Sequence, residues 1–113
     1  MDFRKYQQLA GRTANGKPGD DLLVNFALGI TGEAGEVADI VKKYRFHGHP
    51  LNREDLIGEL GDVLWYVSQI AQLAAIGLDE IAESNIAKLM KRYPNGFSEE
   101  DSLKRRDVKN LGG

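Results

Sequence analysis

Two pairs of acidic residues with the same spacing lie inside apolar stretches of this chain. They are Glu33-x-x-Glu36, in GEAGEVADIVKKY, and Glu59-x-x-Asp62, in GELGDVLWYV. Residues three apart on a helix lie within about 60° of each other, so each pair can reach one ligand from one face. The four carboxylates therefore predict two helices that offer oxygen ligands to a common site.

The neighbours of these carboxylates predict that both pairs face inward. Helical geometry gathers apolar side chains around Glu33, namely Phe26, Ile30, Val37, Ile40, Val41 and Tyr44. A similar set surrounds Glu59, namely Leu56, Val63, Tyr66, Val67, Ile70 and Ala74. An inward carboxylate is costly unless it is paired or bound to a metal. The alternative is an ordinary solvated acidic face, which the apolar surroundings disfavour.

The ligand types indicate which cation such a site prefers. The chain has no cysteine, and its two histidines, His47 and His49, lie in a predicted turn. A di-iron site in a helical bundle would use Glu-x-x-His pairs, which are absent. Carboxylates alone suit a hard cation, so we expect Mg²⁺ as the cofactor, with Mn²⁺ as its replacement.

A second group of polar residues follows in the chain. Asn85, Lys88 and Arg92 fall on one helical face, which suits phosphate or sugar oxygens, although a solvated basic edge is the simpler explanation of these residues taken alone. Stacking on a base needs an aromatic ring, and Tyr66 is our candidate among several rings that core packing also explains, namely Trp65, Phe46 and Phe26.

Composition limits the class of protein. The chain has 113 residues, 42% hydrophobic and 28% charged, which is typical of one globular domain. A net charge of −2 argues against binding to a nucleic-acid polymer or to an anionic membrane. The absence of cysteine, of a signal-like start and of a membrane-length apolar run predicts a cytoplasmic protein.

Hydrophobic periodicity predicts helices and no strands. The expected helices cover residues 2–13, 21–45, 52–76 and 78–93, and Gly77 is expected to cap the third. Breakers separate them at residues 15–19, 47–50 and 94–96. We expect an all-α, four- to five-helix antiparallel bundle in a single domain, 1–113, with a partly mobile C-terminal extension at 98–113.

Two further patterns concern packing. Glycines next to the carboxylates predict either a close approach of the acidic helices or a local bend; they are Gly29, Gly32, Gly35, Gly58 and Gly61. The third helix is apolar nearly all round after Asp62, with Leu64 and Trp65 directed away from the acidic face. Four helices can hardly cover both faces, which predicts a dimer or a larger assembly.

These motifs, in this order, resemble those of the MazG-like all-α nucleoside triphosphate pyrophosphohydrolases. The resemblance extends over YQQLAGRTA, GEAGEVADIVKK, GELGDVLWYV and NIAKLMKRYPNGFS. It implies Mg²⁺-dependent hydrolysis of a nucleoside triphosphate between the α- and β-phosphates, by a homodimer or a homotetramer. It assigns the metal to Glu33, Glu36, Glu59 and Asp62, and phosphate or sugar contacts to Asn85 and Lys88, with Arg92 as a less secure addition.

The sequence leaves the catalytic roles and the base open. We take Glu36 as the candidate general base and Glu59 as the second catalytic carboxylate. Two other functions are compatible with the same residues. The chain is then either a non-catalytic helical interaction module, or a nucleotide sensor that binds without hydrolysis.

Overall fold

The structure of the chain, a computed structural model, describes residues 1–16, 21–105 and 107–108. These residues form five helices: α1 (Phe3–Gly11), α2 (Leu22–Phe46), α3 (Arg53–Leu73), α4 (Leu78–Arg92) and α5 (Glu99–Lys104). The predicted all-α class is confirmed, since no strand occurs within the described ranges. Part of the predicted first breaker (17–19) and part of the predicted extension (106 and 109–113) lie outside them.

Short polar side chains fix where four of the helices begin. Asp2, Asp21, Asn52 and Ser98 each accept a hydrogen bond from the backbone N–H three residues ahead. This bond satisfies one of the N–H groups that the first turn of a helix leaves without a partner. None of these helices, over the described residues, is both long and apolar enough to cross a membrane.

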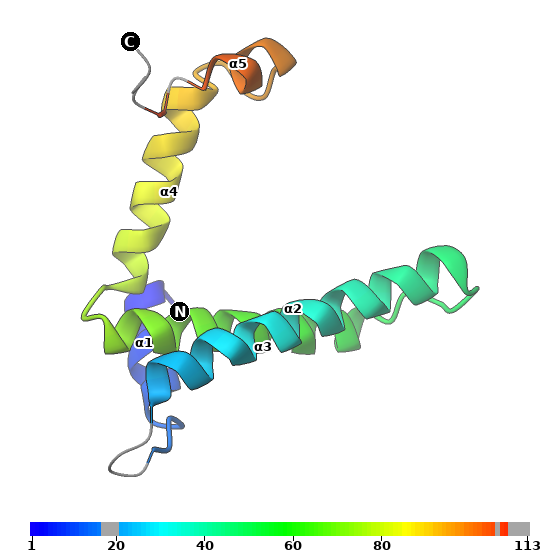
Figure 1. Cartoon of the computed structure of the whole chain (residues 1–113), viewed down its shortest axis with the longest axis vertical. Helices are drawn as coiled ribbons and strands as arrows, with labels where there is room; N and C mark the ends of the chain where they lie inside the picture. The colour runs from blue at the N-terminus through cyan, green and yellow to red at the C-terminus, as the bar shows by residue number, and fades with distance from the viewer. Residues whose placement is uncertain (17–20, 106, 109–113) are drawn as a thin grey trace. The chain divides into compact units, whose positions relative to one another are not determined.

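The chain divides into two compact units, Met1–Leu78 and Asp79–Gly113. In the first unit, α2 and α3 lie side by side and antiparallel (Figure 1). The ring of Tyr66 packs on Gly29, where a Cβ atom would clash with it. At Gly32, Gly35, Gly58 and Gly61 an added Cβ atom would meet open space. Close approach of the helices therefore explains Gly29, whereas the other four leave the backbone beside the carboxylates uncovered.

Helix α1 packs against α3 and is held there by side-chain hydrogen bonds. The Gln7 amide donates to the carbonyl of Ile76 (3.0 Å) and accepts from the N–H of Leu78 (2.9 Å). The indole N–H of Trp65 donates to the Thr13 hydroxyl at 2.7 Å, directly after α1. Since these bonds tie α1 to two separate points along the chain, they fix its position on α3.

The described core of the chain is small. Its buried apolar residues are Ala10, Phe26, Ala71 and Leu78. Trp65 is half-buried and makes edge contacts with Phe26 and Tyr66, with ring centroids 5.4 and 5.1 Å away. Part of the α3 face that we expected a second copy to cover is therefore occupied by the chain itself. Large apolar side chains nevertheless remain exposed elsewhere on the two long helices, among them Val24, Leu28, Ile57 and Leu60.

The second unit contains most of α4 and the segment that follows it. After α4 a bridge pairs Pro94 with Gly96, and Ser98 then begins α5. The predicted extension thus contains a helix within its described residues. Asp107, with 1% of its side chain exposed, forms ion pairs with Arg92 (2.6 Å) and Arg105 (3.3 Å). These contacts attach the end of the described chain to α4.

The end of α3 differs from the sequence prediction. The helix stops at Leu73, and Ala75 takes the left-handed conformation (φ 58°) that we expected of Gly77. The N–H of Ile76 then reaches the carbonyl of Ala71 at 2.8 Å, which closes the helix as a Schellman turn. Because glycine usually occupies such a position, we expected the third helix to be capped at Gly77, and this prediction was wrong.

The left-handed alanine gives a test of the fold. A non-glycine residue in this region costs roughly 1 kcal/mol, so Ala75→Gly should raise the free energy of unfolding by up to about that amount. Ala74→Gly is the matched control, because Ala74 has an ordinary φ of −88° and should lose stability on the same change. Urea unfolding followed by circular dichroism measures both. Equal losses in the two variants would contradict the assigned turn.

Candidate metal centre

Three of the four predicted carboxylates meet at one point between α2 and α3. Glu33, Glu59 and Asp62 each place a carboxylate oxygen within 4.8 Å of the other two. Glu33 and Glu59 are half-buried, whereas Asp62 is exposed. The cluster combines one residue of the first motif with both residues of the second, so the antiparallel pairing of α2 and α3 is what assembles it.

The environment of Glu59 shows what this arrangement lacks. A hydrogen bond with Glu33 raises the pKa of Glu59, and desolvation and the neighbouring charges of Glu33, Asp62 and Asp55 raise it further. The two carboxyl groups can therefore share a proton. The Oε2 atom of Glu59 is buried and has no hydrogen-bond partner among the described atoms. An anionic oxygen in this position requires a cation or a proton.

These residues fit a hard divalent cation. Three carboxylates supply only oxygen donors, which Mg²⁺ and Mn²⁺ prefer. A cation among them would compensate the repulsion between the carboxylates and would bind the unpartnered oxygen of Glu59. Glu33, Glu59 and Asp62 are therefore the residues that could hold the metal.

Glu36 is not part of this group. It lies one helical turn further along α2 and is exposed. Lys43, further along the same helix, feels the charge of Glu36 but forms its ion pair with Asp39, at 2.9 Å. The structure thus brings together three of the four predicted ligands and leaves Glu36 with its carboxylate available beside them.

Tyr6 is a neighbour of the centre that the sequence analysis did not select. Burial and the charge of Asp62 raise the pKa of its hydroxyl, which lies on the half-buried side of α1. With Phe3 and Leu64 it lines an apolar hollow of about 350 Å³. Its place on the apolar face of the first helix was visible in the sequence, but its approach to Asp62 depends on how α1 crosses α3.

The candidate substrate residues lie in different parts of the chain. Tyr66 is half-buried against Gly29 and within the aromatic group of Phe26 and Trp65. Asn85 and Lys88 are exposed on α4, in the second unit. They share one face of that helix, as predicted.

Arg92, on the same helix, is already engaged. Its Nε and Nη2 atoms donate to the two carboxylate oxygens of Asp107 at 2.7 and 2.6 Å. These bonds hold the pKa of Asp107 well below its usual range, with help from Arg105. A bidentate ion pair of this kind uses two of the N–H donors of the Arg92 guanidinium. Sequence reasoning missed it because the two partners are separated along the chain and both look like surface charges.

The chain matches one family model and a protein of known sequence. The chain is 41% identical over 73 residues to the Gene 37 protein of Mycobacterium phage L5, a match that covers 61% of this chain and 64% of that relative. No solved structure matches the chain significantly. The model of the MazG nucleotide pyrophosphohydrolase domain matches residues 24–97, which include all the predicted carboxylates but not α1. The chain therefore belongs to the MazG nucleotide pyrophosphohydrolase domain family.

Proposed function

We propose that the protein hydrolyses a nucleoside triphosphate between its α- and β-phosphates, giving a nucleoside monophosphate and pyrophosphate. The observation that carries this proposal is the meeting of Glu33, Glu59 and Asp62 within 4.8 Å of one another, in a chain of this family. The substrate we expect is a deoxynucleoside triphosphate or an aberrant nucleotide.

In this proposal Glu33, Glu59 and Asp62 hold Mg²⁺, which Mn²⁺ can replace. The bound cation would neutralise triphosphate oxygens and lower the barrier to attack at phosphorus. The open space beside Gly32, Gly35, Gly58 and Gly61 leaves room for phosphates to approach these carboxylates. Glu59 has the largest role among the three, because its buried oxygen has no other partner.

Glu36 is the candidate general base. It is exposed and lies outside the three-carboxylate group, so its carboxylate can accept a proton from a water molecule. The water oxygen forms a bond to the α-phosphorus as the bond from that phosphorus to the bridging oxygen breaks. Pyrophosphate leaves with the bridging oxygen, and the proton passes to Glu36.

Residues outside the carboxylate group would bind the rest of the nucleotide. Asn85 and Lys88 offer exposed donors suited to phosphate or sugar oxygens, and Lys88 would stabilise the leaving pyrophosphate. Arg92 would have to exchange its bonds with Asp107 for a phosphate before it could take part. Tyr66 remains the aromatic candidate for contact with the nucleoside.

The decisive assay is release of pyrophosphate from canonical and modified deoxynucleoside triphosphates, with and without Mg²⁺. Turnover of any member with formation of its monophosphate supports the enzyme. A folded protein that turns over none of them is instead an interaction module. Tight nucleotide binding without product identifies a sensor.

We also propose that the protein works as a homodimer or homotetramer in the cytoplasm. Large apolar side chains such as Leu28, 67% exposed, and Ile57, 56% exposed, support this proposal, because association would remove them from water. A second copy of the chain is the simplest cover, because a two-fold axis pairs the same patch with itself.

The first test of the site concerns activity. Glu59→Gln should lower kcat by at least about 100-fold, because the metal loses an anionic ligand needed in the transition state. Glu54→Gln removes a charge from an exposed position in the first turn of the same helix and should leave kcat nearly unchanged. Pyrophosphate release at saturating Mg²⁺ measures both. Wild-type turnover by Glu59→Gln would remove Glu59 from the mechanism.

The second test concerns pH. The pKa of Glu59 is higher in the folded protein than its ordinary value of 4.5, so the folded state binds this proton more tightly than the unfolded state does. The contribution of Glu59 to the free energy of unfolding is therefore fully present below its ordinary pKa of 4.5, and it is lost as the pH rises through the folded pKa. In EDTA, Tm of the wild type should fall relative to Tm of Glu59→Gln over this range. Parallel curves for the two proteins would contradict the shared proton.

The third test concerns assembly. Leu28→Lys puts a charge on the exposed apolar side of α2 and should shift the protein toward smaller species in sedimentation equilibrium. Ala27→Lys introduces the same charge one position away on the same helix, where only a methyl group is lost, and should have the smaller effect. A wild-type protein that is monomeric at micromolar concentration would refute the proposed assembly.

A further inference from the structure

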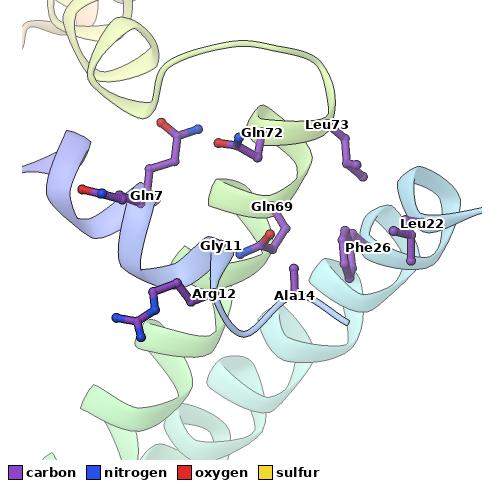
Figure 2. A pocket seen from close by; sticks show the side chains of 10 residues that line it. Gln7, Gly11, Arg12, Ala14, Leu22, Phe26, Gln69, Gln72 and Leu73 are labelled. Carbon is purple, nitrogen blue, oxygen red and sulfur yellow. The ribbon is translucent and has the colours of Figure 1, made fainter. Parts of the chain in front are cut away.

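A pocket of about 380 Å³ lies within the first unit. It is formed by the end of α1, the beginning of α2 and the end of α3 (Figure 2). Its apolar walls include Phe26, Leu22 and Leu73, and it also contains the side chain of Gln69. The volume falls in the range of small-molecule sites.

Gln69 is the unusual member of this lining. Its side chain is only 2% exposed, and its Nε2 atom has no hydrogen-bond partner among the described atoms. Figure 2 shows it at the centre of the pocket, between the end of α1 and Phe26. A buried amide without a partner is unfavourable, so an acceptor that reaches it from the pocket would gain binding energy by satisfying it.

The walls of this pocket are already held in place. Gln7, which also borders it, uses its amide to bind the carbonyl of Ile76 and the N–H of Leu78. The Thr13 hydroxyl accepts from Trp65 and donates to the carbonyl of Ala10 at 2.7 Å. These bonds fix the segment on which the pocket depends, so a ligand would not have to organise it.

We propose that this pocket binds a nucleobase. A planar heterocycle can pack on the ring of Phe26 while a ring nitrogen or carbonyl oxygen accepts from the Gln69 amide. The pocket has no acidic lining residue, and Arg12 is its only charged one among the described residues, so a neutral ring with an anionic extension suits it.

The nucleobase can come from either of two sources. Gln69 follows Asp62 by seven residues, and Phe26 precedes Glu33 by seven, so both lie two helical turns from the carboxylates, about 10.5 Å along each helix. This offset suits the base of the substrate itself, and that assignment rests on the proposed function. Tyr66, however, packs on Gly29 between the carboxylates and the pocket. Because this contact separates the pocket from the carboxylates, it suits the base of a second nucleotide instead.

The experiment uses the full chain and four nucleosides, namely deoxyadenosine, deoxyguanosine, deoxycytidine and thymidine. Titration by calorimetry in EDTA measures binding without phosphates or metal, so the result does not depend on hydrolysis. At least one nucleoside should bind the wild type, and Gln69→Leu should weaken it about tenfold, the loss expected for one buried hydrogen bond. If none binds the wild type, the proposal is wrong.

Two further variants guard against misfolding as the explanation. Gly11 lines the pocket and an added Cβ there meets open space, so Gly11→Leu should fill the pocket and abolish binding without disturbing the fold. Ser68→Ala is the matched control, because Ser68 is a neighbouring buried residue with an unpartnered hydroxyl that does not line the pocket. Unchanged binding in both Gln69→Leu and Gly11→Leu would overturn the proposal.

Kinetics then distinguish the two sources. A nucleoside that raises KM for the triphosphate without changing kcat competes for the place of the substrate's own base. One that binds without this effect occupies a place for a second nucleotide. Binding to a protein that shows no pyrophosphate release would sustain the pocket while the proposed hydrolysis fails.

Discussion

The repulsion among Glu33, Glu59 and Asp62 is the constraint around which the first unit is organised. Three carboxylates at this separation oppose the pairing of the helices that carry them. Packing within two helical turns of the carboxylates stabilises the pair against this repulsion. There Tyr66 covers Gly29, and the rings of Phe26 and Trp65 are in contact. The helix pair thus holds in place an acidic group that would otherwise separate. Protonation relieves part of this repulsion, and a bound cation would relieve more of it.

Most of the local structure could be read from the sequence because local forces decide it. Asp21 and Asn52 mark helix starts through bonds that span three residues, and the acidic pairs share a face through the period of one helix. The departures depend on distant contacts. The antiparallel alignment of α2 and α3 brings Glu33, but not Glu36, into the carboxylate group. Asp107 binds Arg92 although the two residues are fifteen positions apart in the chain. No periodicity encodes either contact.

Helix α1 has a larger part in the first unit than its short length suggests. It lies outside the residues that match the MazG domain, yet it places Tyr6 near Asp62 and Gly11 on the pocket beside Gln69. Its attachment depends on a few specific hydrogen bonds, since Ala10 is its one buried residue. The matched region therefore supplies the three carboxylates, while the residues before it shape what surrounds them.

The environment of Trp65 has a practical consequence. It is the single tryptophan of the chain, and its indole is bonded to Thr13 and packed against Tyr66. Three residues before it on α3 is Asp62, and four residues after it is Gln69. The emission of this one fluorophore therefore reports on α1, on the carboxylates and on the pocket at once. Quenching or a spectral shift would register events at any of them without an attached label.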